Sequence, residues 1–254
     1  MTRNIEEYLK QLKLEQLFKE LGAPKSKILA ETVEHFTTKE AEQRDKIVVS
    51  YFGRQGIDRI TNAIARILLE PPKLSTKAKV LDVGAGTGFF TERIITKIHA
   101  RLPSVDFYAM DLTPAMLLVL AEKKMRITPF IGVAENIEGS VKEARKYVTI
   151  PNKFDAIFST LMLHHSVSPE KVFKSFKAVL KKRGKAIVID MCKHEFVEFK
   201  TEMGDIHLGF EPEDVCRMSR KYFSEVKVEK MHGISCKSSG RSAEIFVAVM
   251  DNCS

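Results

Sequence analysis

The sequence predicts an α/β fold: a doubly wound, mostly parallel sheet of seven strands with an antiparallel last strand, preceded by an N-terminal helical cap. From residue 78 onward, short apolar segments alternate with longer amphipathic ones, which is typical of buried parallel strands joined by helices. Near the C-terminus, two apolar segments follow each other with only a turn-rich stretch between them, which predicts an antiparallel pair. At 254 residues and 44% hydrophobic composition, the chain can bury a full core.

The N-terminal region reads as helical. Residues 4–21 place apolar side chains at steps of three and four, the spacing of an amphipathic helix, and Gly22 and Pro24 end the pattern. Thr37 and Glu40 form a capping-box pair for a second helical region, either one bent helix or two, that extends to about residue 69.

A stretch rich in proline, PPKLSTK at 71–77, separates this region from the alternating pattern. We therefore expect a helical cap or lid over residues 1–75 and a ligand-binding core over residues 76–254.

Within the core, Thr113 and Ser168 each precede a proline and a helical pattern, so both are expected as N-caps. The last two strands are expected over 225–231 and 243–250, joined by a turn over 232–242. The other expected strands cover residues 79–85, 105–111, 127–134, 154–161 and 185–191.

The first strand ends in a glycine-rich motif, VLDVGAGTGFF, at residues 80–90. Glycines before a helix N-terminus present bare amides and the positive end of a helix dipole, which suits a nucleotide-like ligand. A dinucleotide fingerprint does not fit, because the third glycine, Gly88, comes one residue early and Phe89 stands where Gly or Ala is needed. No Gly-Lys-Ser/Thr follows, so the motif is not a P-loop either.

The motif resembles motif I of the class I S-adenosylmethionine-dependent methyltransferases. The resemblance implies their Rossmann-like fold and S-adenosyl-L-methionine as the cofactor. It places the amino-acid portion of the cofactor against the glycine loop: Asp82, Gly84, Ala85, Gly86, Thr87 and Gly88. Asp111, which ends the second strand, would bind both ribose hydroxyls, because one carboxylate can accept two hydrogen bonds from a vicinal diol. Leu112 would lie against the adenine.

Three later segments resemble the same family in the right order. GVAENI at 132–137 resembles the segment that flanks the adenine, with Val133 where an aspartate is common; Ala134 or Glu135 would then recognise the adenine. FDAIFSTLMLHH at 154–165 resembles motif IV of the ubiquinone/menaquinone-biosynthesis methyltransferases, whose backbone near Thr160 receives the methionine amino group. VLKKRGKAIVID at 179–190 matches the segment of the fifth strand.

The acceptor site is expected beyond the carboxyl ends of the fourth and fifth strands. Candidate bases or substrate contacts there are His165, His194 and His207, with His164 beside the first. His194 and Glu198 share a helix face and could bind a divalent metal with His207, but we assign no metal ligands.

Other side chains could contribute to the acceptor site. Cys192 and Cys236 could face it and bind a thiophilic acceptor, as in the arsenite methyltransferases that share this fold. Pocket candidates in the cap are Tyr8, Tyr51, Phe52 and Arg54.

The leading hypothesis is therefore methyl transfer to a small-molecule or lipid-like acceptor. The net charge of +8 leaves an RNA methyltransferase open but does not favour it, since the excess is spread evenly and FSTL replaces the N/D-P-P-Y-type tetrad. A non-catalytic methyltransferase-like binding module is a third possibility.

Location and assembly are less constrained by the sequence. No apolar run reaches the ~20 residues of a membrane span. The charged N-terminus lacks a signal-peptide core, and the cysteines lack a disulfide or CxxC pattern, so we expect a cytoplasmic enzyme. A homodimer is possible.

Overall fold

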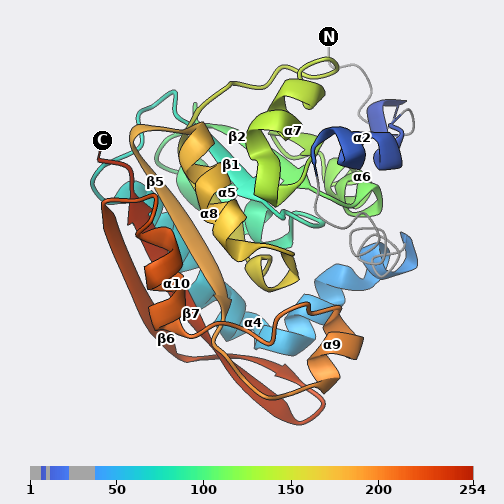
Figure 1. Cartoon of the computed structure of the whole chain (residues 1–254), viewed down its shortest axis with the longest axis vertical. Helices are drawn as coiled ribbons and strands as arrows, with labels where there is room; N and C mark the ends of the chain where they lie inside the picture. Colours follow the sequence, from blue (N-terminus) through green and yellow to red (C-terminus); the bar gives the residue numbers. More distant parts are fainter. Residues whose placement is uncertain (1–6, 10–11, 23–37, 254) are drawn as a thin grey trace.

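The computed structural model describes residues 7–9, 12–22 and 38–253. Its centre is one seven-stranded sheet with the order β3-β2-β1-β4-β5-β7-β6 (Figure 1). Neighbouring strands from β3 to β5 are parallel, whereas β7 pairs antiparallel with both β5 and β6. The predicted fold is therefore confirmed. The strands are β1 (Lys79–Val83), β2 (Asp106–Asp111), β3 (Ile127–Ile131), β4 (Phe154–Thr160), β5 (Leu180–Met191), β6 (Glu225–Ser238) and β7 (Arg241–Asp251).

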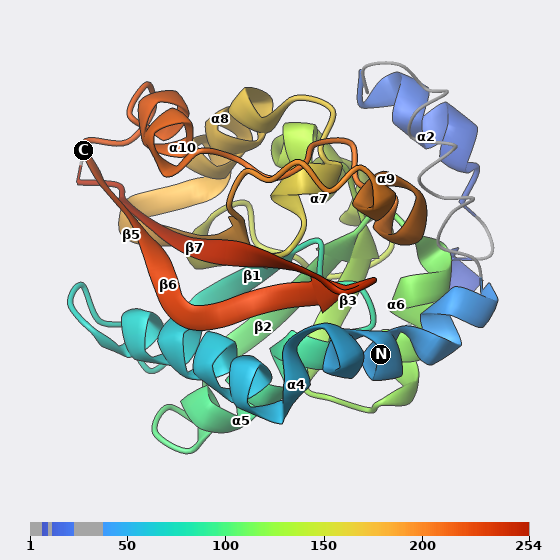
Figure 2. The ribbon, with the colours of Figure 1, turned by 90° about the horizontal axis from the view of Figure 1, so that it is seen from below.

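Helices cover both faces of the sheet. Viewed along its edge, α4 and α5 lie on one face, and α7, α8 and α10 lie on the other (Figure 2). Two apolar clusters fill the layers, because strands buried on both faces carry apolar side chains at nearly every position. The helices are α2 (Leu14–Glu20), α4 (Thr38–Leu69), α5 (Phe89–His99), α6 (Pro114–Glu122), α7 (Ile137–Ala144), α8 (Pro169–Val179), α9 (Glu198–Met203) and α10 (Pro212–Ser219).

The long helix α4 has two parts, separated by Gly53, which has a non-helical conformation with φ +61°. In the second part, Ile60, Ile64 and Leu68 are fully buried in the cluster that also covers the sheet. At the end of this part, the buried Lys185 ammonium of β5 donates hydrogen bonds to the carbonyls of residues 67, 70 and 71. A cation at a helix C-terminus satisfies carbonyls that have no partner in the helix. The second half of α4 thus belongs to the core packing, and the boundary at residue 75 stays a prediction.

The C-terminal pair differs from the expected one. Most of the predicted turn over 232–242 is strand, since β6 extends to Ser238 and the chain reverses at Ser239 and Gly240. The register between β6 and β7 shifts between Lys230 and Ser235, where Gly233 has φ +72°. A bulge with a glycine of positive φ produces turn-like residues inside a strand, which explains the wrong boundary.

At the N-terminus, the predicted helix over 4–21 is interrupted, because residues 12 and 13 are not helical and α2 begins at Leu14. The expected cap at Thr37 lies outside the described residues. Thr113 and Ser168 do precede α6 and α8, but neither side chain makes a capping hydrogen bond. No helix in the described part of the chain is long and apolar enough to cross a membrane.

Candidate functional site

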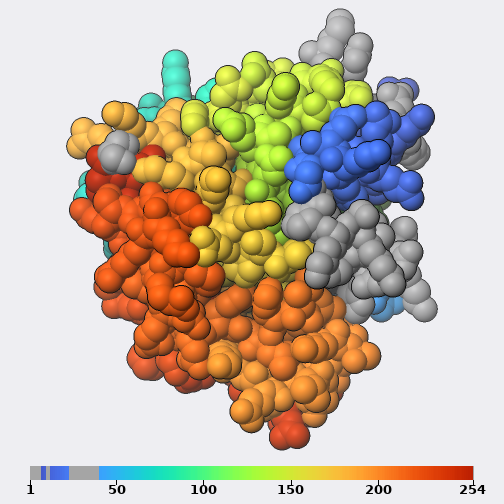
Figure 3. Space-filling model, viewed as in Figure 1, coloured from blue at the N-terminus to red at the C-terminus, as the bar shows by residue number. Residues whose placement is uncertain are grey.

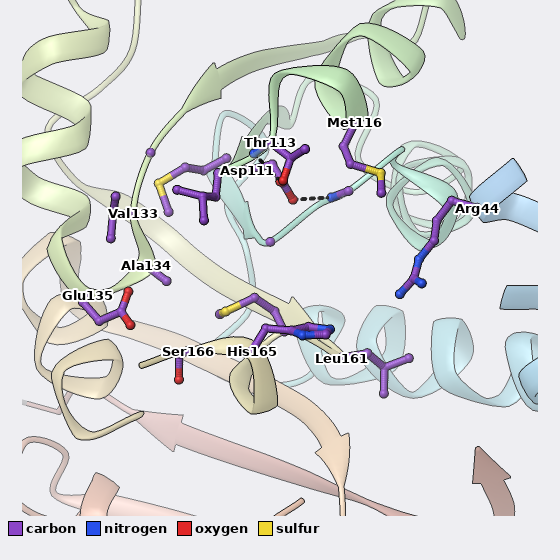
Figure 4. A pocket seen from close by; sticks show the side chains of 16 residues that line it. Arg44, Asp111, Thr113, Met116, Val133, Ala134, Glu135, Leu161, His165 and Ser166 are labelled. Carbon is purple, nitrogen blue, oxygen red and sulfur yellow. Dashed lines mark hydrogen bonds between the residues drawn. The ribbon is translucent and has the colours of Figure 1, made fainter. Parts of the chain in front are cut away.

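A crevice lies where the carboxyl ends of β1, β2, β3 and β4 meet, the position expected for a ligand in an open α/β sheet (Figure 4). It contains about 780 Å³ of space that no atom fills, its open mouth included, within the range of sites for small organic ligands. Its lining comprises Arg44, Gly84, Gly86, Met110, Asp111, Leu112, Thr113, Met116, Gly132, Val133, Ala134, Glu135, Leu161, Met162, His165 and Ser166.

The glycine loop forms one wall of this crevice. Gly84, Gly86 and Gly88 all have positive φ, between 55° and 75°, which side chains other than glycine rarely adopt. A Cβ on Gly84 would overlap the side chain of Met162, whereas a Cβ on Gly86 would meet no atom within 4 Å. The bare backbone at Gly86 therefore leaves open space at the crevice wall.

Asp111 lies at the end of β2 with both carboxylate oxygens held by backbone amides (Figure 4). The amide of Gly86 donates to Oδ2 at 2.7 Å, and the amide of Thr113 donates to Oδ1 at 2.8 Å. Burial raises the pKa of Asp111, and these hydrogen bonds oppose that effect. Each oxygen keeps further acceptor capacity, so the carboxylate can accept two more hydrogen bonds from a ligand in the crevice.

Other predicted residues of the motif lie behind the loop and do not line the crevice. Asp82 is buried and accepts a hydrogen bond from Thr91; burial raises its pKa to about 7. The Thr87 hydroxyl donates to Asp45 of α4 at 2.5 Å, and Lys123 donates to the same carboxylate at 2.6 Å. Ala85 and Gly88 form the turn itself, where the Gly88 amide donates to the Ala85 carbonyl. These residues shape the loop in the structure, and their contact with a ligand stays a prediction.

The residues predicted to flank an adenine lie together at one end of the crevice. Leu112, Val133, Ala134 and Glu135 all line it. One oxygen of the Glu135 carboxylate accepts hydrogen bonds from the amides of Val167 and Ser168, at 2.8 and 3.3 Å. Glu135 thus holds the two residues that precede α8, and Ser168 stands at the predicted N-cap position without a capping hydrogen bond from its side chain.

The opposite end of the crevice is formed by Leu161, Met162 and His165 after β4, with Met116 and Arg44 facing them (Figure 4). Thr160 does not line the crevice, and its buried hydroxyl has no hydrogen-bond partner among the described residues. Arg44 reaches in from α4, about forty residues before the glycine motif. No sequence signal points to it, because it reads as one charged residue on an amphipathic helix. Met162 and Ser166, which directly follow the predicted strand, could have been found from that position alone.

The two adjacent histidines after β4 occupy different environments. His165 lines the crevice, and its Nδ1 lies 3.0 Å from the carbonyl oxygen of Gly204. His164 is buried behind it; its Nδ1 lies 2.6 Å from Asp190, and its Nε2 lies 3.4 Å from Asp205. Although burial alone would lower the pKa of His164, the two carboxylates raise it above its usual value. Burial raises the pKa of Asp205 to about 6, against the opposing effect of His164.

The other two candidate histidines do not line the crevice. His194 stacks on Phe196 with ring centroids 5.0 Å apart, and His207 Nε2 lies 3.0 Å from the carbonyl oxygen of Ser166. Burial lowers the pKa of both. Glu198 pairs with Arg241 at 3.6 Å. Among the described residues, the group whose possible ligand atoms come together is His164, His165 and Asp205, so the metal hypothesis based on His194, Glu198 and His207 is wrong.

Several side chains considered for the acceptor site are part of the core instead. Cys192 and Cys236 are buried, and burial raises their pKa values to about 11 and about 12, so both are neutral thiols near pH 7. Tyr8 is buried, and its hydroxyl accepts a hydrogen bond from the Ile131 amide. Phe52 packs edge-on against Phe90.

Comparison with known proteins agrees with this geometry. The family model described as "Methyltransferase domain" matches residues 74–235, which is more than half of the chain. The ubiquinone/menaquinone biosynthesis C-methyltransferase UbiE of Pseudomonas savastanoi is 26% identical over 128 residues, covering 50% of this chain and 47% of the relative.

Two further similarities extend this result. The hybrid PKS-NRPS synthetase apdA of Emericella nidulans is 26% identical over 168 residues, covering 65% of this chain and 4% of the synthetase. The chain thus spans less than half the length of these curated relatives. A solved structure of Haemonchus contortus phosphoethanolamine N-methyltransferase 2, in complex with phosphomonomethylethanolamine and S-adenosylhomocysteine, superposes with a TM-score of 0.63 at 15% identity, covering 96% of this chain and 61% of that one. With the fold, the glycine motif and the crevice in agreement, this chain belongs to the methyltransferase domain family.

Proposed function

We propose that the protein transfers a methyl group from S-adenosylmethionine to a small-molecule or lipid-like acceptor. One observation carries the proposal: the carboxylate of Asp111 is fixed by two backbone amides inside an open crevice, next to a glycine loop. A carboxylate presented in this way suits the vicinal hydroxyls of a ribose.

The lining of the crevice fits the rest of this cofactor. The apolar side chains of Leu112, Val133 and Ala134 would hold the adenine, and the open space at Gly86 would accommodate the methionine portion. Glu135 also lines this end, and its carboxylate could accept a hydrogen bond from the adenine amino group. The bound cofactor supplies an activated methyl group on a sulfonium.

The protein has to align the acceptor with that methyl group and exclude water. Alignment of two reactants provides a large part of the rate of such a displacement. Leu161, Met162 and Met116 provide apolar walls at this end, and His165 provides an imidazole. When nothing is bound to its Nε2, His165 could take a proton from an acceptor that carries one at working pH. The guanidinium of Arg44 suits an acceptor with an apolar body and an acidic group.

Two observations count against the alternative acceptors. A run of basic residues in α8 and the start of β5 could favour RNA: Lys174, Lys177, Lys181, Lys182 and Arg183. Two of its lysines have partners within the protein, because Lys177 contacts Asn252 and Lys181 forms an ion pair with Asp155 at 2.9 Å. The raised pKa values of Cys192 and Cys236 disfavour thiolate chemistry on arsenite.

The acceptor class can be tested with S-adenosylmethionine that carries a radioactive methyl group. The protein is incubated with total RNA, a lipid extract and a small-molecule extract in separate reactions, with Asp111→Ala as the inactive control. We expect label in the lipid or small-molecule reaction with wild type only. Label in RNA would replace the proposal by the RNA alternative, and a failure to bind the cofactor at millimolar concentration would leave the non-catalytic module.

A second variant tests the acceptor end separately. His165→Gln should keep its affinity for S-adenosylmethionine and lose turnover, by roughly 100-fold if the imidazole acts as the base. An unchanged pH–rate profile with unchanged turnover would remove His165 from the reaction.

A further inference from the structure

Beneath the acceptor end of the crevice, two histidines and one aspartate come together from two parts of the chain. His164 and His165 follow β4, whereas Asp205 lies after α9, in the segment that forms the lower part of the face shown in Figure 3. One possible ligand atom from each residue lies within 4.8 Å of the other two. His164 and Asp205 are buried, and His165 opens onto the crevice.

The environment of the Asp205 carboxylate is an independent observation that points to a ligand site. Its side chain is fully buried, yet neither oxygen accepts a hydrogen bond from any described residue. A buried carboxylate without donors is costly, and native proteins normally pair it or use it to coordinate a metal. The contact with His164 at 3.4 Å is electrostatic and too long for a good hydrogen bond.

Both imidazoles are oriented as metal ligands are. His164 presents Nδ1 to the Asp190 carboxylate at 2.6 Å, and His165 presents Nδ1 to the Gly204 carbonyl at 3.0 Å. Both partners are acceptors, so we assign the proton to Nδ1 in each ring and the lone pair to Nε2. A histidine ligand typically donates its other N–H to a carboxylate or a backbone carbonyl in this way.

The distances between the possible ligand atoms also fit a metal site. The 3.4 Å between His164 Nε2 and Asp205 Oδ1 matches the edge, about 3.4 Å, of a tetrahedron whose metal–ligand bonds are about 2.1 Å. The other separations between the possible ligand atoms are at most 4.8 Å, so a bound metal would draw these atoms closer together. Three protein ligands leave a further coordination position open.

We propose that His164, His165 and Asp205 bind a first-row divalent metal ion such as Zn²⁺, with Asp190 and the Gly204 carbonyl orienting the two imidazoles. Two nitrogen ligands and one oxygen ligand favour this class over Mg²⁺ and Ca²⁺, which prefer oxygen. Arg44 acts electrostatically on both His164 and Asp205, so its positive charge weakens the binding of a cation without removing the site.

The test is calorimetric titration of tag-free, chelator-treated protein with Zn²⁺, with neither cofactor nor acceptor present, so its outcome does not depend on methyl transfer. We expect saturable binding of one ion per chain and no binding of Mg²⁺. Asp205→Asn and His165→Gln should each weaken Zn²⁺ binding by about 10- to 100-fold or more. His232→Gln, which changes an exposed histidine of β6, is the matched control and should leave binding unchanged.

A spectroscopic measurement on the unmodified protein guards against variants that fail to fold. Co²⁺ should give visible absorption of a four- or five-coordinate site without a thiolate band, and the absorption should disappear in Asp205→Asn. Absence of saturable Zn²⁺ binding and of this absorption in wild type would overturn the proposal and leave the cluster as a buried ion pair only. Equal Zn²⁺ affinity of Asp205→Asn and wild type would also overturn it.

Discussion

The two ends of the crevice are built in different ways. At the cofactor end, the ligand-facing residues come from short segments at or after the ends of β1, β2 and β3, and backbone amides hold the carboxylates of Asp111 and Glu135. At the acceptor end, Arg44, His165 and Asp205 come from segments far apart in the chain. Residues at the ends of neighbouring strands are held in one binding geometry by the sheet. Residues from distant segments are not constrained in this way, so they can differ to suit a different acceptor.

The largest expected effect concerns Gly84, where the two ends touch. Gly84→Ala should lower the free energy of unfolding by about 2–4 kcal/mol, because the new Cβ overlaps Met162 and φ is +75°. Gly86→Ala is the matched control, with similar φ but open space, and should cost about 1–2 kcal/mol. Denaturant unfolding measures both, and equal losses would show that the two ends do not constrain each other at this contact.

A second prediction concerns the buried carboxyl of Asp82 beneath the cofactor loop. Its pKa is about 7 in the folded protein, against an unfolded value of 3.8, so the folded state holds more protons between these pH values. Its contribution to stability therefore falls as the pH rises from about 4 to about 7 and is constant above that range.

Asp82→Asn should remove this dependence on pH. Relative to wild type, the free energy of unfolding of the variant should therefore rise by about 1–3 kcal/mol between pH 4 and pH 8. Unfolding at several pH values measures the difference, and Asp106→Asn at the exposed end of β2 is the control. If the difference in stability between variant and wild type does not change with pH, the Asp82 carboxyl is ionised in the folded protein over this whole pH range.

The smallest expected effect concerns the link between α4 and the glycine loop. Thr87→Val removes the hydroxyl that donates to Asp45, which should cost about 0.5–1.5 kcal/mol of stability and weaken cofactor binding slightly. Thr96→Val on the exposed face of α5 is the same substitution and should stay within about 0.5 kcal/mol. Should the two variants behave alike, α4 would not be coupled to the loop through Asp45.

The contrast between the two ends of the crevice also explains which features could be predicted from the sequence. The strand order and the positions of Gly84, Gly86 and Asp111 follow from local patterns, because periodicity and glycine conformations act within a few residues. Arg44 and the pairing of His164 with Asp190 and Asp205 depend on contacts between distant segments, which local patterns do not encode. The same limitation explains why the hydrogen bonds of Glu135 to the segment before α8 were not anticipated, and why the bulge in β6 was mistaken for a turn.

The most direct test of the central claim is calorimetric binding of S-adenosylmethionine to wild type, Asp111→Ala and Asp106→Ala. The two aspartates stand at opposite ends of β2, so the pair separates a role in the crevice from a general effect on the strand. We predict that Asp111→Ala weakens binding by about 1.5–3 kcal/mol and that Asp106→Ala leaves it unchanged. Equal affinity of wild type and Asp111→Ala would contradict the assignment of the ribose to this carboxylate.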